Sequence, residues 1–364
     1  MSDARLTIVL PLKGKPDFTR RWLAYAAERL PYPVLVADGS LDADASPVVA
    51  LCGGYARRGR PVEYVRYPYD ADLSAFYEKL VDAVGRVRTP YVVLADNDDF
   101  FSPAGLRLCI EHLDAHARHT ACGGRFIGFT LDDGGSERVR GRKISFDGDG
   151  SAFDLEEKTA AARVRAHFAR YHPTWYDVHR TGLLRDALGV LRSANPKDIF
   201  LVELWTSFLP LTTGPIGRVA APYLFRQRDT PGSQAATAAA KSGYLERARA
   251  PGWDADVTRL CADIASAVAA VDGTSAAEAL VSVRAEFNAY LAATIDSEAG
   301  SRRAAAGRGR LKTALSSSPV GRAALGPLKA ASAALRRLRA RPLPAGDRAE
   351  ADALRAFLQP LEKS

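Results

Sequence analysis

The sequence is poor in the features that stabilise small secreted proteins or anchor a chain in a bilayer. Only four cysteines occur in 364 residues, and they are widely spaced with no Cys-x-x-Cys pair. This spacing indicates neither a disulfide framework nor a zinc site, and it is typical of a reducing compartment. No run of about 18 apolar residues is present, so no membrane-spanning helix is predicted. The apolar run before Pro11 is too short for a secretory signal, and we expect a cytoplasmic protein.

Acidic residues are absent from one stretch, between Ser301 and Pro344, which contains eleven lysines and arginines. The whole chain has a formal net charge of +8, so subtracting those eleven charges leaves −3 for the remainder. A basic face spread over a fold indicates nucleic-acid binding, whereas a confined basic segment is typical of a tail that touches an anionic partner. We expect residues 301–341 to contact an anionic membrane surface at the inner face of the cell membrane, with a solvated linker as the alternative. No nucleic-acid partner is expected, because the tail has no aromatic residue before Phe357 to stack on bases.

The first 120 residues alternate between short apolar runs and helical patterns. The apolar runs predict strands at 6–10, 34–37, 62–67 and 91–95. This alternation predicts an α/β fold with a mostly parallel central sheet, whose ligand lies at the carboxyl ends of the strands. We divide the chain into a domain at 1–230 with halves at 1–120 and 121–230, a helical extension at 231–300, and a partly flexible basic tail at 301–364.

Three carboxylates, those of Asp96, Asp98 and Asp99, directly follow the fourth predicted strand. Like charges this close repel one another unless a cation or hydrogen-bond donors neutralise them. Oxygen ligands select a hard metal ion, Mg²⁺ or Mn²⁺. The alternative is a turn rich in Asp and Asn that has only a structural role. A second acidic turn, Asp38-Gly39-Ser40, ends a neighbouring strand and favours the metal site.

Several of these segments together resemble a known family. They are Leu6–Pro11, Val34–Ser40 and Val92–Asp99, to which Pro11–Gly14, Arg66–Tyr69 and Asp198–Trp205 are added for a subgroup. The first three resemble the nucleotide-binding half of family-2 glycosyltransferases of the GT-A fold. The last three are similar to a bacterial and archaeal subgroup of putative glycosyltransferases. The resemblance covers residues 6 to 105 and continues to 226.

The resemblance implies a role for individual residues. Asp38 would contact the base or ribose of the donor, Asp96 and Asp98 would lie against the nucleotide, and Asp99 together with Asp98 would hold Mg²⁺ or Mn²⁺ at the diphosphate. Lys79 is a further candidate for a donor contact, although the family's usual helix start is altered there. The implied activity is metal-dependent, inverting transfer of a sugar from a nucleotide sugar to a glycan, lipid-linked or protein acceptor. Such a hexosyltransferase-like enzyme would act in surface polysaccharide or glycoconjugate biosynthesis.

An inverting transfer also needs a carboxylate base that takes the proton of the acceptor hydroxyl. In the family this base lies well past the aspartate turn, near a helix N-terminus, and Glu203 stands 107 residues after Asp96. Asp198 is the rival candidate, and its alternative role is the N-cap of a helix predicted at 199–211. Asp177 is a third candidate.

Two other functions are left open by the residues. A sugar-phosphate nucleotidyltransferase would share an α/β core with acidic metal ligands, but the loop Leu10–Pro16 lacks the Gly-x-Gly such an enzyme needs. A non-catalytic binding scaffold of the same fold is the other alternative.

A stretch of aromatic residues and a group of three histidines each allow two interpretations. The stretch Tyr171–Asp177 is dense in aromatic residues and predicts either core packing or stacking on an acceptor sugar. His112, His116 and His119 fall on one predicted helix, and without a completing acidic pair they indicate a surface helix rather than a zinc site.

Overall fold

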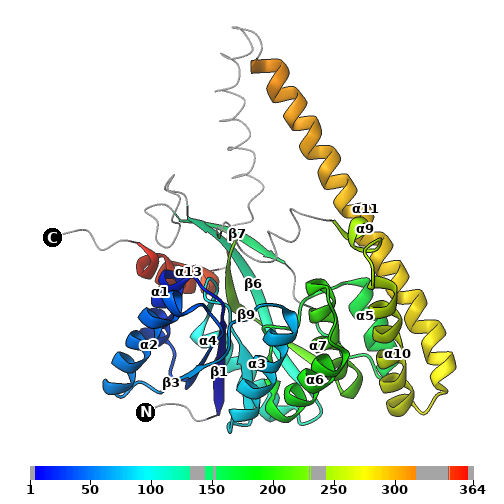
Figure 1. Cartoon of the computed structure of the whole chain (residues 1–364). Coiled ribbons are helices and arrows are strands. Elements are labelled where there is room, and N and C mark those ends of the chain that lie inside the picture. The colour runs from blue at the N-terminus through cyan, green and yellow to red at the C-terminus, as the bar shows by residue number, and fades with distance from the viewer. Residues whose placement is uncertain are drawn as a thin grey trace.

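The computed structural model describes residues 5–131, 144–150, 153–228, 230, 243–316, 343 and 345–359, with backbone alone at 147–150, 301–302, 304–316 and 345. In these residues nine strands form one sheet, with helices around it (Figure 1). The strands are β1 (Leu6–Leu12), β2 (Val34–Asp38), β3 (Val62–Arg66), β4 (Tyr91–Leu94), β5 (Phe100–Phe101), β6 (Ala121–Leu131), β7 (Ile144–Gly150), β8 (Val178–Arg180) and β9 (Ile216–Gln227). The helices are α1 (Pro16–Arg29), α2 (Asp42–Arg57), α3 (Leu73–Arg86), α4 (Pro103–Ala115), α5 (Ala160–Ala169), α6 (Thr181–Ala194), α7 (Ile199–Thr213), α9 (Tyr244–Arg247), α10 (Trp253–Asp272), α11 (Ala276–Ser316) and α13 (Ala345–Leu358).

The strand order across the sheet is β3-β2-β1-β4-β8-β6-β9-β5, and β7 pairs with β6. β1 runs parallel to both β2 and β4, β2 runs parallel to β3, and β6 runs parallel to β9. β8 is antiparallel to its two neighbours and joins the parallel half to the second half. The predicted α/β fold with a mostly parallel central sheet and C-terminal helices is therefore confirmed.

The central parallel strands consist mostly of apolar residues because both faces of the sheet are covered. Ile8, Val36 and Val93 are fully buried, as expected for parallel strands between helical layers. The register places Leu12 beside Asp38, so β1 and β2 end side by side. β4 lies on the other side of β1, and the carboxyl ends of three strands therefore meet at one edge of the sheet.

Side chains fix the starts of the helices that follow these strands. The Asp72 carboxylate caps α3 by accepting a hydrogen bond from the backbone of Ala75 at 3.0 Å. Ser102 caps α4 in the same way through the backbone of Gly105, and Pro103 occupies the first helical position, as its sequence predicts. These caps set the direction in which the chain leaves the site.

The helices after β9 form an extension beside the sheet. α10 packs on α7 and α11, and α11 also packs on α5, while its far half extends past the other described elements (Figure 1). None of the described helices combines the length and apolar character needed to cross a bilayer. The predicted basic segment 301–341 continues α11 to Ser316, and residues 317–342 lie outside the described part of the chain. Its contact with an anionic surface stays a prediction.

The end of the chain returns to the sheet domain as α13, which lies beside α1 (Figure 1). Phe357 packs edge-on against Tyr25 with ring centroids 5.3 Å apart, and Leu354 is buried. Asp347 forms an ion pair with Arg125 of β6. The region assigned to the tail thus includes an amphipathic helix that is part of the folded body, because its apolar spacing matches a helix face.

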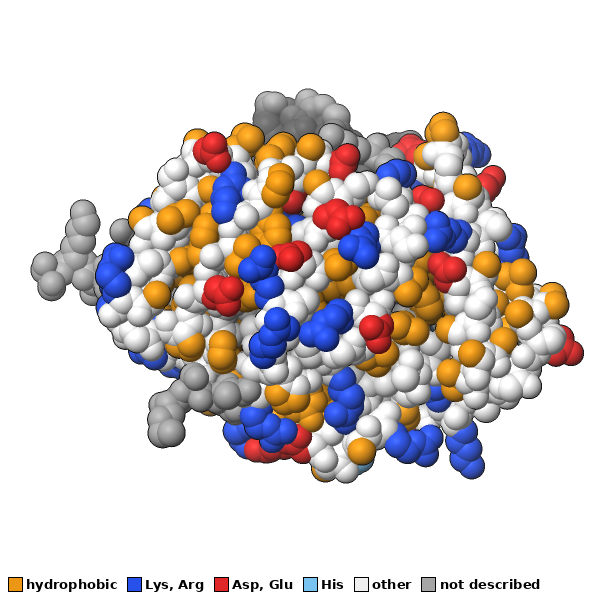
Figure 2. All heavy atoms as spheres, turned by 60° about the horizontal axis from the view of Figure 1, so that its bottom comes forward, with side chains coloured by type: hydrophobic (Ala, Val, Ile, Leu, Met, Phe, Trp, Pro, Cys, Tyr) orange, Lys and Arg blue, Asp and Glu red, His pale blue; other side chains and the backbone are white. Residues whose placement is uncertain are grey.

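Figure 2 shows the face at the bottom of Figure 1, where the N-terminal ends of the parallel strands lie. Lys and Arg side chains are interspersed there with Asp and Glu side chains, between patches of hydrophobic atoms. Charges of both signs therefore share this face, which lies opposite the strand ends that carry the candidate site.

Candidate functional site

The turn after β4 gathers three carboxylates, as its sequence predicts. Each of Asp96, Asp98 and Asp99 offers a carboxylate oxygen, and these oxygens lie within 4.8 Å of one another. Asp96 and Asp98 are half-buried, and Asp99 is buried. Within the described ranges, no other group of acidic, histidine or cysteine side chains brings its ligand atoms together in this way. An all-oxygen set of this kind fits Mg²⁺ or Mn²⁺.

Residues of β9 hold the aspartate turn from the opposite side. The Oδ1 atom of Asp99 accepts a hydrogen bond from the backbone N–H of Gln227 at 3.0 Å, and its Oδ2 atom accepts one from Nε of Arg226 at 3.1 Å. The indole of Trp22 donates to the backbone carbonyl of Asp99 at 3.0 Å. Each carboxylate oxygen has a second lone pair, so these bonds orient Asp99 and leave it able to bind a cation.

The pKa values of the turn show that it is short of positive charge. Burial raises the pKa of Asp99 to about 8; Arg226 opposes this rise, while Asp98 and Asp96 add to it. Burial and then Asp98 raise the pKa of Asp96 to about 6, against the hydrogen bond that Tyr176 donates to it. One guanidinium therefore does not neutralise the cluster, and a divalent cation would favour its ionised form.

We expect the apparent affinity of this turn for Mn²⁺ to rise as the pH is raised from 6 to 8, because the ion displaces protons from Asp96 and Asp99. Without metal, the stability of the folded protein changes with pH in the opposite direction. The folded chain retains a proton on Asp99 that the unfolded chain, with a pKa of 3.8, has lost, so stability falls as the pH rises toward 8. Calorimetric titration with Mn²⁺ in buffers of different ionisation enthalpy measures the proton release. An affinity that is constant over this pH range would contradict the expectation.

Arg226 contacts the aspartate turn although the sequence did not point to it, and Tyr176 belongs to the aromatic stretch Tyr171–Asp177. The Arg226 side chain is 41% exposed, and its Nη2 atom donates to the Tyr176 hydroxyl at 3.2 Å. The Tyr176 hydroxyl in turn donates to Asp96 at 2.5 Å. Arg226 is far from the aspartate turn in the chain, and the only local signal is a basic residue after the apolar run Tyr223–Phe225.

Glu203 lies near the aspartate turn, as the base candidate must. It projects from the second turn of α7 and is half-buried, and its Oε2 atom accepts a hydrogen bond from Tyr171 at 2.6 Å. Its negative charge contributes to the raised pKa values of both Asp96 and Arg226, after the effects of burial and closer neighbours. The charge of Glu203 therefore acts on Asp96 and Arg226 from a different part of the chain.

Asp198 is held in a structural role at the start of α7. One carboxylate oxygen accepts a hydrogen bond from the backbone N–H of Phe200 at 2.9 Å. This is the N-cap interaction that the sequence predicts as the alternative role of Asp198. The other oxygen pairs with Nη1 of Arg247 at 2.6 Å. Both oxygens are thereby occupied, and a role as base stays a prediction.

Asp177, the third base candidate, lies inside the sheet domain. It is fully buried and pairs with Arg218 of β9 at 2.6 Å. Burial raises its pKa to about 6, and the guanidinium opposes that rise. The carboxylate packs against Gly123, where a Cβ would lie 2.1 Å from its Oδ1 atom. This buried pair joins β6, β8 and β9.

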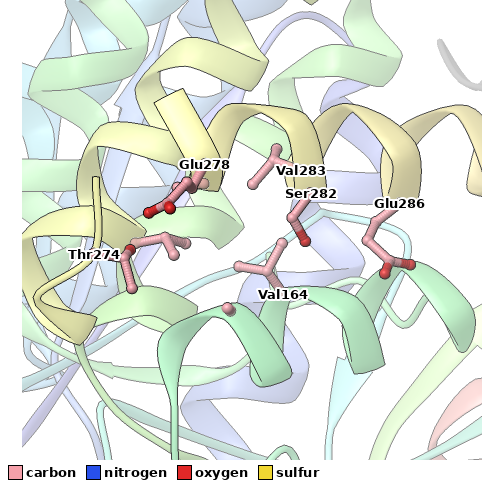
Figure 3. Close-up of a pocket in the computed structure, with 9 residues that line it drawn as sticks. Val164, Thr274, Glu278, Ser282, Val283 and Glu286 are labelled. Atoms are coloured by element: carbon pink, nitrogen blue, oxygen red, sulfur yellow. The ribbon is translucent and has the colours of Figure 1, made fainter. Parts of the chain in front are cut away.

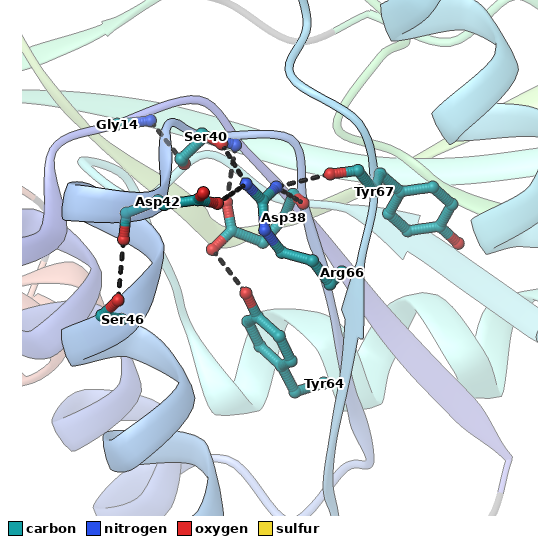
Figure 4. Close-up of polar contacts among 8 residues, drawn as sticks. All are labelled: Gly14, Asp38, Ser40, Asp42, Ser46, Tyr64, Arg66 and Tyr67. Carbon is teal, nitrogen blue, oxygen red and sulfur yellow. Dashed lines mark hydrogen bonds and ion pairs between the residues drawn. The ribbon is translucent and has the colours of Figure 1, made fainter.

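Asp38 ends β2 in a dense hydrogen-bond network (Figure 4). Its Oδ1 atom accepts from the backbone of Ser40 at 2.9 Å, and its Oδ2 atom accepts from the Tyr64 hydroxyl at 3.0 Å. Arg66 donates to the backbone carbonyls of Asp38 and Ser40 at 3.0 and 2.6 Å. The Ser40 hydroxyl accepts from the backbone of Gly14, which joins this turn to the end of β1. Asp38 therefore sets the shape of the turn, and its contact with a donor stays a prediction.

Lys79 lies beneath the same strand ends. It is 2% exposed, donates to the backbone carbonyl of Leu12 at 2.8 Å and forms a buried ion pair with Asp70. Burial lowers the pKa of Lys79 and raises that of Asp70, while each opposes the other's shift. Gly39 is required here because a Cβ would lie 2.3 Å from Oδ1 of Asp70. Lys79 thus supports the ends of these strands, and a direct donor contact stays a prediction.

The aromatic stretch before β8 divides between two environments. Trp175 and Tyr176 are buried, in agreement with core packing, whereas Tyr171 is half-buried beside Glu203. The prediction that three histidines fall on one helix is wrong, because α4 ends at Ala115 and both His116 and His119 follow it. The chain turns back there, and His112 Nε2 and His119 Nδ1 lie 2.8 Å apart.

A small hollow between α5, α10 and α11 lies outside the aspartate site (Figure 3). It measures about 160 Å³, below the range of about 300–1,000 Å³ that holds small-molecule ligands. Its lining includes Val164, Ser282 and two glutamates, Glu278 and Glu286, and contains no residue of the two aspartate turns. This hollow is therefore not the donor site.

Comparison with known proteins gives likenesses to solved structures at low sequence identity. No family model matches the chain, and no curated protein sequence matches it. The crystal structure of S. aureus TarS aligns with a TM-score of 0.47 and 15% identity over 76% of this chain and 41% of that one. TarS 1–349 in complex with UDP-GlcNAc aligns with a TM-score of 0.46 and 15% identity over 76% and 69%. The mannosyltransferase PcManGT from Pyrobaculum calidifontis, in complex with GDP-Man and Mn²⁺, aligns with a TM-score of 0.42 and 13% identity over 82% of each chain.

The chain thus spans less than half of the longer TarS structure.

Proposed function

We propose that this protein is a glycosyltransferase that uses Mg²⁺ or Mn²⁺ and a nucleotide-sugar donor to modify a glycan, lipid-linked or protein acceptor. The observation that carries the proposal is the meeting of the aspartate turn and Arg226 at one edge of the sheet, with the charge of Glu203 on α7 acting on both. The turn after β4 supplies three carboxylates, β9 supplies the guanidinium of Arg226, and α7 supplies the carboxylate of Glu203. The resemblance of the two aspartate turns to family-2 enzymes supports the same conclusion.

The donor side combines metal ligands with a fixed positive charge. Asp98 and Asp99 would hold the ion, which supplies Lewis-acid stabilisation of the charge that develops on the departing diphosphate. Arg226 is anchored to Asp99 and half-exposed, so it adds a guanidinium to the same region. The turn shaped by Asp38 borders this region through the shared strand ends and would bind the base or ribose.

The acceptor side contains the base. Glu203 takes the proton from the acceptor hydroxyl as that oxygen forms a bond to the anomeric carbon of the donor sugar. The bond from that carbon to the diphosphate oxygen breaks, and the nucleoside diphosphate leaves with the electron pair. Attack from the opposite side inverts the configuration at the anomeric carbon. Tyr171 holds the Glu203 carboxylate in place for this proton transfer.

The wider setting follows from the same proposal. A transferase of this kind would act in surface polysaccharide or glycoconjugate biosynthesis, and the basic segment 301–341 would bring it to an anionic membrane surface where lipid-linked acceptors are found. The alternatives are a sugar-phosphate nucleotidyltransferase and a non-catalytic scaffold, and the donor titration below separates them.

We expect one nucleoside diphosphate among UDP, GDP, CDP and dTDP to bind in the presence of Mn²⁺ and to be released by EDTA. Asp99→Asn should weaken this binding by about 10–100-fold or more, because the variant removes a charged ligand. Isothermal titration calorimetry measures both effects, and Asp186→Asn, a change at an exposed aspartate of α6, is the matched control. Binding that is indifferent to Mn²⁺ and to Asp99 would show that the turn is structural and would favour the scaffold. Mn²⁺-dependent turnover of a nucleoside triphosphate and a sugar phosphate would favour the nucleotidyltransferase.

A further inference from the structure

Three tyrosines from three distant segments form a wall beside Glu203. Tyr171 precedes β8, Tyr244 begins α9, and Tyr290 lies on α11. The hydroxyls of Tyr244 and Tyr290 are 3.4 Å apart, and the rings of Tyr171 and Tyr290 have centroids 5.4 Å apart. We call these three residues the tyrosine wall. Two of them come from the helical extension rather than from the sheet domain.

The tyrosine wall and Glu203 share one environment. Tyr171 donates its hydroxyl to Glu203 at 2.6 Å. Burial is the main cause of the raised pKa values of Tyr244 and Tyr290, and the charge of Glu203 contributes to the rise in both. Both side chains are half-buried, so part of each ring is reached by solvent.

Contacts with phenylalanine rings and a backbone hydrogen bond within the extension hold the tyrosine wall in place. The rings of Phe168 and Tyr290 have centroids 5.6 Å apart, and those of Phe200 and Tyr244 are 5.1 Å apart. The backbone N–H of Tyr244 donates to the carboxylate of Glu298 on α11 at 2.9 Å. The extension therefore holds its tyrosines in fixed positions next to the base candidate.

We propose, on the basis of the proposed function, that the tyrosine wall is the acceptor subsite and that the acceptor presents a sugar ring to Glu203. A pyranose ring has an apolar C–H face and a rim of hydroxyl groups. Half-exposed tyrosines offer a matching ring face together with a polar hydroxyl. The Glu203 carboxylate and the phenol hydroxyls, which bond to one another in pairs, keep further lone pairs for the hydroxyls of a sugar and would find no such donors on an alkyl chain. The helical extension thereby completes the enzyme, because the sheet domain supplies only one of the three tyrosines.

The test uses the full-length protein with a panel of methyl α- and β-pyranosides of glucose, galactose, mannose and N-acetylglucosamine as probes. Saturation-transfer NMR is recorded with Mg²⁺, which is diamagnetic, and with the nucleoside diphosphate identified by calorimetry. At least one methyl pyranoside should bind the wild type through its ring C–H protons. Tyr244→Ala and Tyr290→Ala should each weaken that binding by about tenfold, and the corresponding Phe variants, which keep the ring, should weaken it less.

The matched control is Tyr55→Ala, which removes a half-buried tyrosine of α2 and should leave glycoside binding unchanged. Nucleotide binding should be the same in every variant. Where an alanine variant does not fold, the leucine variant at the same position, which keeps apolar volume without a ring, decides in its place. Equal glycoside binding by wild type and variants, or no binding by the wild type while nucleotide and Mn²⁺ bind, overturns the acceptor subsite and leaves the proposed function standing. If the wild type binds no nucleoside diphosphate, the proposed function itself is overturned.

Discussion

Replacing Glu203 with glutamine is expected to slow sugar transfer by about 10²–10⁴-fold, the usual contribution of a positioned general base. Glutamine keeps the shape of the side chain and can still accept a hydrogen bond from Tyr171, but it cannot take the proton of the acceptor hydroxyl. The donor side is built by other elements, so binding of nucleotide and Mn²⁺ should be unchanged. Rate measurements with the donor identified by calorimetry, combined with nucleotide titration of the same samples, check both expectations.

Two further variants make the Glu203 experiment decisive. Glu111→Gln changes an exposed glutamate of α4 and should have wild-type activity. Asp198→Asn should affect mainly stability, because its carboxylate caps α7 and pairs with Arg247. If Asp198→Asn abolishes transfer in a folded protein while Glu203→Gln retains it, the base is Asp198 and not Glu203.

The second large effect is expected on stability rather than on chemistry. Lys79→Met leaves the buried carboxylate of Asp70 without its cation, and breaking a buried ion pair from one side costs about 3–5 kcal/mol. The strand ends that Lys79 supports through the Leu12 carbonyl should loosen at the same time. Urea unfolding followed by circular dichroism measures the change in the free energy of unfolding.

The double variant Asp70→Asn/Lys79→Met tests the cause of that loss. Removing both charges also removes the unpaired buried carboxylate, so the double variant should recover much of the stability lost in Lys79→Met. If Lys79→Met instead unfolds like the wild type and only nucleotide binding is lost, Lys79 contacts the donor directly, as the resemblance suggests.

The parts of this protein that the sequence predicts are those that depend on neighbouring residues along the chain. The apolar runs of β1, β2 and β4 predict buried parallel strands, because such strands need apolar side chains on both faces. The Ser102-Pro103 pair predicts the start of α4 through local capping chemistry. The clustering of Asp96, Asp98 and Asp99 follows from their adjacency alone.

The parts that the sequence does not predict depend on pairing between distant segments. Arg226 reaches Asp99 because β9 pairs with β5, and strand pairing of that kind leaves no local signal. The environments of Lys79 and Asp198 were undecided for the same reason, since burial and partners come from other elements. The amphipathic pattern of α13 is present in the sequence, but the basic composition of the segment before it favours a tail over a packed helix.

By itself, the sequence determined the class of the sheet, the position of the aspartate turns and the clustering of three carboxylates after β4. These properties are local, because strand character, helix caps and a run of carboxylates each depend on a few consecutive residues. Only the tertiary structure decided that the Arg226 guanidinium pairs with Asp99, that Tyr171 donates to Glu203, and that the helical extension brings Tyr244 and Tyr290 together. These contacts form only when the completed sheet and the helices around it bring segments together that are far apart along the chain.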